Sequence, residues 1–333
     1  METNSLENNF VVETRERKTA ILKKGTFGCL KGILSINVTM GCLLGCVYCY
    51  ARGYPGAPGY RKAILFENLP QKLKTELSKK RKKVTHVLFN TASDCFQPHP
   101  DIMHTSVALM EILLSNSIPI SFLTKGVIPR RFFDMVSHNN FTDLIRPSLG
   151  MVSLANEYHE RFEPYAATPK ERLNNIEKLI DINVVPDIRI DPIIPFVTDS
   201  KGDFELLFKE LKARGIQKAS LSYLHLRPAI EKQFNRELDG LNLRLLEGIF
   251  LNSGWETVGS STRSKLVPKK VRERGYGRAM EAAEKYGLKI SICSCKNPDI
   301  PGETCTERPD NIPSPTFYEE KETQLSFSFS NQK

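Results

Sequence analysis

The stretch GCLLGCVYCY, residues 41–50, places Cys42, Cys46 and Cys49 at the spacing C-x3-C-x2-C. The preceding segment, 32–38, has apolar residues at alternate positions, which predicts a strand. The triplet is therefore expected in a loop directly after a strand, where parallel sheets carry their active sites. Three close thiolates can hold three irons of a 4Fe–4S cluster and leave the fourth iron open. A structural zinc site would need four protein ligands, and neither a histidine nor a fourth cysteine is near in the sequence.

Short apolar strands alternate with amphipathic helices after the triplet, which is typical of a parallel sheet covered by helices. About six such units fit into about 200 residues, two short of the eight units of a full TIM barrel. We therefore expect an α/β fold, a partial (β/α)6 TIM-type barrel with a C-terminal extension of helices and a strand. The predicted strands are 32–38, 84–90, 118–124, 149–154, 186–194 and 218–225, and the predicted helices are 69–77, 102–114, 130–137, 169–182 and 203–214.

Changes in pattern and composition along the chain suggest four parts. Residues 1–30 are polar and mixed and are expected to be an N-terminal extension, and 31–228 form the partial barrel. The part 229–300 is a C-terminal extension, with helices expected at 241–251 and 271–286 and a strand at 288–292. Residues 301–333 are rich in Pro, Ser, Thr and Glu and are expected to be a disordered tail.

The composition excludes several classes of protein. Among the 333 residues, 40% are hydrophobic and 9% aromatic, enough to bury a core, which excludes wholesale disorder. No run reaches the roughly 18 apolar residues of a membrane helix, so we expect no membrane partner. The first 18 residues contain four Glu and no apolar core, unlike a secretory signal, so we expect a cytoplasmic protein. In a reducing compartment, the eight cysteines are then metal ligands or thiols rather than disulfides.

A second cysteine group, Cys293, Cys295 and Cys305, has the spacing C-x-C-x9-C, which is not a common zinc pattern. The sequence leaves open whether these residues hold a second iron–sulfur cluster, a zinc ion or no metal. Residues elsewhere that could supply a fourth ligand are Cys29, His99 and His104.

The cysteine triplet, with an aromatic residue, Tyr48, before its last cysteine, resembles the signature of the radical S-adenosylmethionine (radical SAM) superfamily. The resemblance implies a partial (β/α)6 barrel, which agrees with the count of six units. It also implies that SAM binds the open iron of a 4Fe–4S cluster. One electron then cleaves SAM to a 5′-deoxyadenosyl radical, which abstracts hydrogen from a substrate.

Further motifs, in order over residues 19–225, are similar to the spore photoproduct lyase-like branch, also called DNA repair photolyase-like. They are TAILKK at 19–24, SDCFQP at 93–98, TK at 124–125, RFEP at 161–164 with RL at 172–173, and PIIP at 192–195 with Asp199. The resemblance implies a lyase-like enzyme that acts on nucleic acid in DNA-lesion repair.

By the same resemblance, four residues at strand ends contact SAM, and they are Tyr50, Ser93, Lys125 and Ser153. The lyase donates a hydrogen atom from a cysteine two residues before the serine of its S-D motif, and Thr91 stands at that position here. Cys95, one residue past Asp94, is the candidate catalytic thiol. The alternative role for Cys95 is packing in the core.

The expected partners are a reductant such as flavodoxin or ferredoxin, and DNA or another nucleic acid. The net charge of 47 − 38 = +9 and the basic run 79–83 are compatible with a polyanion. A second basic set comprises Lys265, Lys269, Lys270, Arg272, Arg274 and Arg278, and Arg227 is expected at the mouth of the barrel. The segment QLSFSF at Gln324–Phe329 resembles peptides that dock on the DNA sliding clamp, and the alternative is a sticky tail.

Two other functions stay open. The radical chemistry could act on a protein or a small molecule. Alternatively, the chain could be a non-enzymatic iron–sulfur electron carrier or a metal-responsive binding protein that uses both cysteine groups.

Overall fold

The computed structural model describes residues 10–25, 30–258 and 263–303. Its centre is an eight-stranded sheet in the order β14-β10-β9-β8-β7-β6-β3-β2. Six neighbouring strands of this sheet run parallel, as the six predicted units require. These strands are β3 (Leu34–Ile36), β6 (Val87–Phe89), β7 (Ile120–Thr124), β8 (Ile145–Gly150), β9 (Asp187–Ile193) and β10 (Lys218–Tyr223).

Two further strands extend this sheet at its edges. β14 (Lys289–Ile292) adds a seventh parallel strand beside β10, and β2 (Lys23–Lys24) pairs antiparallel with β3. β14 and β2 are the ends of the strand order, so the sheet stays open and does not close into a barrel. The α/β fold with a partial barrel is thereby confirmed.

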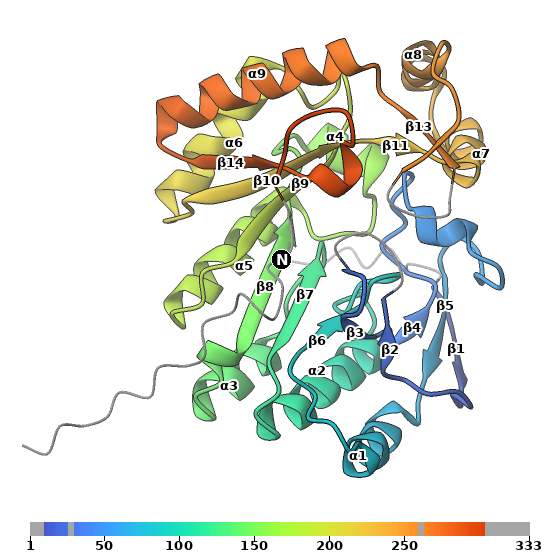
Figure 1. Ribbon diagram of the computed structural model, residues 1–333, viewed down its shortest axis with the longest axis vertical. Helices are drawn as coiled ribbons and strands as arrows, with labels where there is room; N and C mark the ends of the chain where they lie inside the picture. Colours follow the sequence, from blue (N-terminus) through green and yellow to red (C-terminus); the bar gives the residue numbers. More distant parts are fainter. Residues whose placement is uncertain (1–9, 26–29, 259–262, 304–333) are drawn as a thin grey trace, which may run out of the picture.

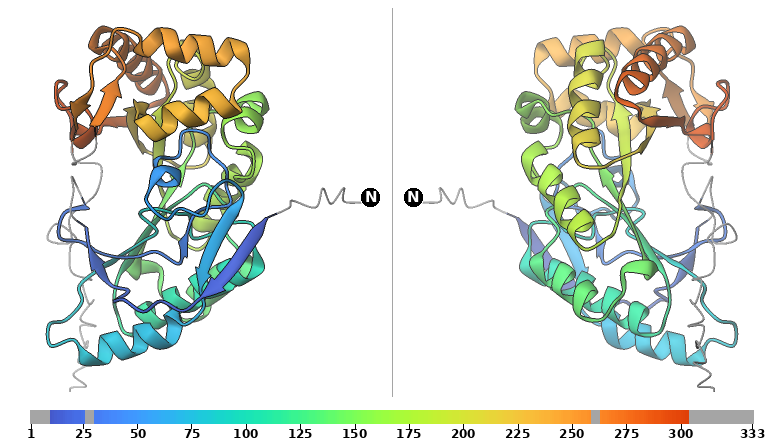
Figure 2. Two further views of the ribbon diagram at one scale, coloured as in Figure 1. Left: turned by 90° about the vertical axis from the view of Figure 1, so that its right-hand side faces the viewer. Right: turned by 90° about the vertical axis from the view of Figure 1, so that its left-hand side faces the viewer.

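Helices follow the strands and cover the outer side of the curved sheet. In Figure 1 they run from α1 and α2 at the bottom, past α3 and α5, to α6 and α9 at the top, and Figure 2 shows the same layer from two sides. They bury apolar faces such as Leu69 and Leu73 of α1. Their bounds are α1 (Leu69–Lys79), α2 (Pro100–Ser115), α3 (Arg130–His138), α5 (Pro169–Asp181), α6 (Lys201–Ala213) and α9 (Lys269–Tyr286).

The start of α5 follows directly from its sequence. Thr168 is the N-cap and accepts a hydrogen bond from the backbone of Glu171, whose carboxylate accepts from the backbone of Thr168 in return. Pro169 occupies the first helical position, where its missing N–H costs nothing.

The predicted strand 149–154 was wrong at both ends. β8 begins at Ile145, and residues 151–154 lie beyond its last residue, Gly150. Its first half contains Arg146, Pro147 and Ser148, which break the apolar run that the prediction relied on. Burial nevertheless alternates along these residues, as a strand requires.

The two ends of the described chain add smaller elements. From the predicted N-terminal extension, β1 (Val11–Arg15) pairs parallel with β5 (Lys62–Phe66), which also pairs with β4 (Thr39–Met40). The C-terminal part adds α7 (Pro228–Glu237), α8 (Gly240–Phe250) and a small sheet of β11 (His225–Leu226), β13 (Arg263–Leu266) and β12 (Glu256–Thr257). The short elements η2 (Tyr50–Gly53), η3 (Thr142–Leu144), α4 (Asn156–Phe162) and η4 (Ser294–Lys296) complete the fold.

Within the described residues, we find no helix with the length and apolar character needed to span a membrane.

Candidate active site

The three cysteines of the triplet lie on one loop between β4 and η2. The loop is held by its own backbone, since the N–H of Cys49 donates to the carbonyl of Cys46 at 3.1 Å. It is also held by side chains, because Arg52 donates to the Cys46 carbonyl at 3.3 Å and Gln233 of α7 donates to the Cys49 carbonyl at 3.0 Å. Gly45 has φ +67°, and a Cβ there would lie 2.8 Å from the Tyr165 ring, so the turn needs glycine.

The ligands of a 4Fe–4S cluster and of a single metal ion need different arrangements, and the described side chains can be compared with both. In the parts of the chain that it describes, no three His, Cys, Asp or Glu side chains are grouped so that they could hold one ion. In a 4Fe–4S cluster, each thiolate binds a different iron, so its ligands need not converge on one point. Three thiols on one loop match the three protein ligands expected for such a cluster.

Burial raises the pKa of all three thiols. For Cys46 the pKa rises to about 12, through burial and the nearby Glu163 carboxylate. For Cys42 the neighbouring Asp94 adds to the effect of burial. The metal-free thiols are thus protonated at neutral pH, and iron would displace their protons on binding.

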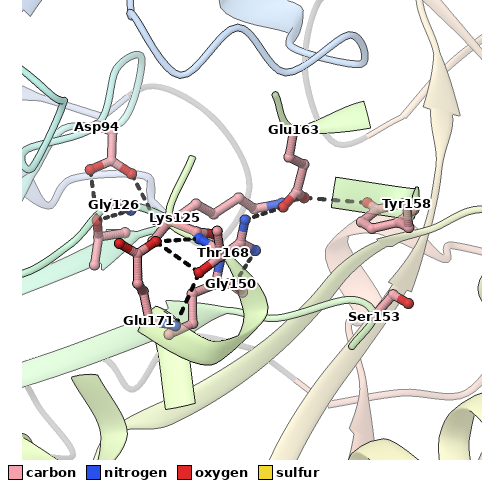
Figure 3. Close-up of polar contacts among 12 residues, drawn as sticks. Asp94, Lys125, Gly126, Gly150, Ser153, Tyr158, Glu163, Thr168 and Glu171 are labelled. Carbon is pink, nitrogen blue, oxygen red and sulfur yellow. Dashed lines mark hydrogen bonds and ion pairs between the residues drawn. The ribbon is translucent and has the colours of Figure 1, made fainter. Parts of the chain in front are cut away.

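Beneath the triplet lies the Glu163 cluster, which comprises Tyr48, Lys125, Tyr158, Glu163 and Arg172. Arg172 and the Tyr48 hydroxyl donate to the two oxygens of the Glu163 carboxylate. Lys125 Nζ donates to it at 2.8 Å and Tyr158 at 3.3 Å (Figure 3). Burial alone would raise the pKa of Glu163, but Arg172 and Lys125 outweigh burial and lower it.

This cluster is net cationic, because one carboxylate faces two cations. Both Glu163 and Arg172 are buried, and the Lys125 side chain is only 12% exposed. Burial raises the pKa of Asp94, whose carboxylate accepts from the backbone N–H of Lys125 at 2.8 Å. A 4Fe–4S cluster with three thiolates carries a net negative charge, which the net positive charge of Lys125, Arg172 and Glu163 complements.

Three residues of the Glu163 cluster belong to the sequence motifs on which the resemblance rests, but those motifs do not predict that the residues are in contact. Glu163 and Arg172 belong to the RFEP and RL motifs, and Tyr48 is the aromatic residue of the triplet. The motifs identify these residues as candidates, but only the tertiary structure brings the three side chains together.

Lys125, one of the expected SAM contacts, already uses its three ammonium hydrogens. Its Nζ donates to Glu163, to the Tyr48 hydroxyl and, at 3.2 Å, to the carbonyl of Asp191. An ammonium has three donors. A direct hydrogen bond from Lys125 to SAM would therefore have to replace one of these three.

Tyr50 lies beside Arg227, which the sequence placed at the barrel mouth. The Arg227 guanidinium is 4.7 Å from the centre of the Tyr50 ring, and the Tyr50 hydroxyl donates to the carbonyl of Thr91 at 2.6 Å. The Tyr54 ring packs edge-on against Tyr50 at 5.7 Å. These contacts bring the position of the lyase's donor cysteine, here Thr91, next to Tyr50.

The two serines are placed differently. The Ser93 hydroxyl donates to the carbonyl of Thr39 at 3.5 Å, next to the triplet loop. Ser153 follows β8, accepts a hydrogen bond from the backbone of Ala155 at 3.1 Å, and lies to one side of the Glu163 cluster in Figure 3.

Cys95 lies in the hydrophobic core with no exposed surface. Its carbonyl accepts from Ser106 at 2.7 Å, and burial, followed by Asp94, raises the pKa of its thiol well above the usual value. A substrate radical would need contact with the sulfur, so this burial favours the packing role over hydrogen donation.

Two members of the second cysteine group lie together at the end of β14. The Sγ atoms of Cys293 and Cys295 are 3.0 Å apart. The next residue, Lys296, forms an ion pair at 2.6 Å with Asp191, which lies within β9. Cys305, Cys29 and the segment Gln324–Phe329 lie outside the described residues.

The second basic set is largely occupied by internal contacts. Arg272 is buried and pairs with Asp299 at 2.6 Å, and Arg278 pairs with Asp199 at 2.7 Å. Lys265 lies 5.0 Å from the centre of the Trp255 ring. These cations therefore stabilise the packing of α9 and its neighbours.

Relatives known by sequence cover part of this chain. An uncharacterized protein of Mycobacterium tuberculosis (strain ATCC 25618 / H37Rv) is 24% identical over 217 residues, 63% of this chain and 64% of the relative. The chain thus spans about two thirds of that relative's length. A protein of Pseudomonas phage M6 named radical SAM Nalpha-GlyT isomerase is 25% identical over 52% of this chain and 35% of its own length.

Solved structures of spore photoproduct lyase share the fold. One mutant of that lyase superposes with a TM-score of 0.63 at 13% identity, over 85% of this chain and 82% of its own. A mutant with bound AdoMet and dinucleoside spore photoproduct gives 0.62 at 14% identity, over 84% and 81%.

The family model described as the radical SAM superfamily matches residues 36–211, just over half of the chain, and includes the triplet and the Glu163 cluster. This chain belongs to the radical SAM superfamily.

Proposed function

We propose that this radical SAM enzyme abstracts a hydrogen atom from a nucleic-acid substrate, in a lyase-like reaction of DNA-lesion repair. The observation that carries the cofactor assignment is the net cationic Glu163 cluster directly beneath three thiols on one loop. The substrate assignment is supported by the net charge of +9 and by the shared fold with spore photoproduct lyase.

Cys42, Cys46 and Cys49 would hold the 4Fe–4S cluster. When bound, the cluster and SAM supply a 5′-deoxyadenosyl radical. Tyr50, Ser93, Lys125 and Ser153 would orient SAM, with a cation, two hydroxyls and an aromatic ring matching its carboxylate, ribose and adenine. Glu163 and Arg172 act through Lys125 and Tyr48 and are positioning residues.

The test is anaerobic reconstitution with iron and sulfide, followed by iron quantification and a SAM cleavage assay after dithionite reduction. Cys42→Ala, Cys46→Ala and Cys49→Ala should each remove the cluster absorbance at about 400 nm. Cys95→Ala is the matched control, because it removes a buried thiol outside the triplet and should keep that absorbance. If all three triplet variants kept a full cluster and cleaved SAM, the assignment of the ligands would be wrong.

The substrate class is tested by assaying SAM cleavage with and without damaged DNA, and by salt-sensitive retention on DNA. An alternative substrate is a protein or a small molecule. The phage relative, which is named as an isomerase, is consistent with a reaction other than DNA-lesion repair. Cleavage that responds to a peptide or a metabolite but not to DNA would support it. A full cluster without SAM cleavage would support the non-enzymatic electron carrier.

A one-electron reductant is required, and we propose a flavodoxin or a ferredoxin in the cytoplasm, where thiols stay reduced. The test is to mix the reconstituted protein with reduced flavodoxin or ferredoxin and to record the change in the absorbance of the cluster as it is reduced.

We also propose that Cys293 and Cys295, with Cys305, bind a second cluster or a zinc ion. The neighbouring positions of the first two thiols on one short segment after β14 support this proposal. Reconstituted protein should then hold more than about four irons, or about one zinc in addition. A metal content unchanged in the triple alanine variant would exclude the second site.

A further inference from the structure

A cavity of about 480 Å³ lies between the segment that precedes β2 and the triplet loop. Arg17, Lys18 and Lys23 line one side of it. Gly41, next to Cys42, and Ala51, next to Tyr50, line the other side. None of the four expected SAM contacts is among the residues that line it, but Ala51 and Ala92 are the sequence neighbours of Tyr50 and Ser93, so the cavity adjoins the proposed SAM site.

The basic side of the cavity has few counterions. Glu76 lies close enough to Arg17 to act on its charge, but its carboxylate oxygens accept from the backbone N–H groups of Ile21 and Leu22. Glu16 is the carboxylate among the lining residues, and it forms no ion pair with Arg17, Lys18 or Lys23 in the described structure. By contrast, Arg272 and Arg278 in the second basic set each have an acidic partner. Three cations against two carboxylates, Glu16 and Glu76, leave a positive balance that favours an anionic occupant.

Arg17 is the most informative of the three cations. Its guanidinium lies 5.0 Å from the centre of the Phe66 ring, and its Nε is buried without a hydrogen-bond partner among the described residues. The Arg17 backbone is held by Asn68, whose side chain accepts from its N–H at 2.9 Å. A partly buried guanidinium that is oriented by an aromatic ring and lacks an acceptor matches a site for an oxyanion.

The far side of the cavity is rigid and adjoins the triplet loop. Thr39 donates to the Gly41 carbonyl at 2.9 Å and accepts from Gln97 at 2.8 Å, which holds the backbone just before Cys42. Tyr54 also lines the cavity and is 39% exposed, and its ring contacts Tyr50. An occupant would therefore meet an aromatic surface within reach of the proposed SAM site.

We propose that this cavity binds a phosphate ester of the substrate, with Arg17, Lys18 and Lys23 on the phosphate and Tyr54 beside the attached nucleoside. The inference deepens the proposed function and rests on it for the reaction. A nucleic-acid strand and a free nucleotide share this phosphate chemistry, and the experiment separates them.

The test measures binding to the cluster-reconstituted protein under anaerobic conditions, without SAM. The probes are thymidine, thymidine 5′-monophosphate and a fluorescein-labelled single-stranded thymidine 12-mer. The variant is the triple substitution Arg17→Gln, Lys18→Gln and Lys23→Gln. The control removes the same charge from the exposed faces of α5 and α6, by Lys170→Gln, Lys178→Gln and Lys209→Gln, outside the cavity and outside the basic run 79–83.

The unsubstituted protein should bind the monophosphate on the order of tenfold more tightly than thymidine, because charge-assisted hydrogen bonds hold the phosphate. The cavity variant should lose this preference, and the control should keep it. If a strand is the natural ligand, the 12-mer binds far more tightly than the monophosphate. Its log–log salt slope should then fall by about two in the cavity variant. Equal affinity for both probes identifies a free nucleotide.

Three results would overturn the inference. The first is that the unsubstituted protein shows no preference for the monophosphate over thymidine, and the second is that both triple variants lose this preference equally. The third is a cavity variant that binds nucleotides normally but accepts electrons from flavodoxin more slowly. The last result would assign the basic side of the cavity to an acidic protein partner. Circular dichroism of each variant checks folding, and Arg17→Lys, which keeps the charge, provides a milder second variant. SAM cleavage is measured separately, so this inference and the proposed function can fail independently.

Discussion

At the scale of single residues, Glu163 is a buried carboxylate on which two buried or nearly buried cations depend. It is buried with Arg172 and Lys125, and its two oxygens accept from both cations and from Tyr48. A buried ion pair adds little net stability compared with an apolar replacement, because desolvation offsets the attraction. Removing one partner is different, since it leaves the other charges buried and uncompensated.

Glu163→Gln should therefore lower the free energy of unfolding by about 3–5 kcal/mol, measured by urea unfolding of the metal-free protein. Glu160→Gln, on the exposed side of α4, is the matched control and should change it by less than about 0.5 kcal/mol. A similar small effect for both variants would mean that the Glu163 cluster does not hold the site together.

His86 gives a pH dependence with a definite sign. It is 5% exposed, and burial together with the nearby Arg146 lowers its pKa to about 4 from the usual 6.5. Between these two values, the unfolded chain binds a proton that the folded protein does not bind. Stability from the neutral histidine is thus complete above pH 6.5 and is lost as the pH falls toward 4.

Replacing His86 by Leu removes this titration. As the pH falls over this range, the unsubstituted protein should lose stability that His86→Leu does not lose. The difference between the two losses in the free energy of unfolding should reach up to about 3 kcal/mol. Urea unfolding at several pH values measures this, and His138→Leu, at the exposed end of α3, is the control. Parallel pH profiles for all three proteins would contradict the assignment to His86.

At the scale of elements, α7 anchors the triplet loop to the C-terminal part of the chain. Arg52 of η2 forms a bidentate pair with Glu237 at 2.5 and 2.8 Å, and both side chains are largely buried. Gln233, one turn earlier on α7, donates to the Cys49 carbonyl. The helix thus holds the loop on which the cluster would be built.

Glu237→Gln breaks this pair and leaves the Arg52 guanidinium without its carboxylate. We expect a loss of about 2–4 kcal/mol in stability and faster release of iron to a chelator from the reconstituted protein. Glu231→Gln, on the same helix but more exposed, should release iron at the unsubstituted rate. Equal release rates for both variants would show that α7 does not support the loop.

At the scale of the whole molecule, the tail tests the link to DNA repair away from the active site. Leu325, Phe327 and Phe329 are apolar residues in a segment otherwise made of Gln, Ser and Asn. If they dock in the groove of a sliding clamp, affinity should be on the order of micromolar, because ordering the peptide offsets much of the burial.

Deleting residues 324–333 should abolish clamp binding in calorimetry and leave SAM cleavage intact. Replacing Ser326 and Ser328 by Ala keeps the apolar anchors and should preserve binding. An intact protein that shows no heat of binding at tens of micromolar, roughly tenfold above the expected constant, would remove the clamp as a partner.

The six-unit sheet and the triplet loop were predictable from the sequence because each depends on a local pattern of residues. Alternating apolar residues define strands such as β7, and Thr168 with Pro169 marks the start of α5. The cysteine spacing needs no tertiary information, since the three thiols are on one short loop. β8 was predicted with the wrong bounds because Arg146 and Pro147 interrupt its apolar run, although its paired neighbours accommodate them.

What only the tertiary structure decided is which distant side chains meet. Glu163 contacts Lys125 and Arg172, and Arg52 contacts Glu237 across 185 positions. Cys95 is enclosed by the core. The basic side of the cavity, with Arg17 held beside Phe66, arises in the same way. Sequence spacing determines local geometry, whereas burial and charge pairing depend on how strands and loops pack, so these contacts follow from the fold alone.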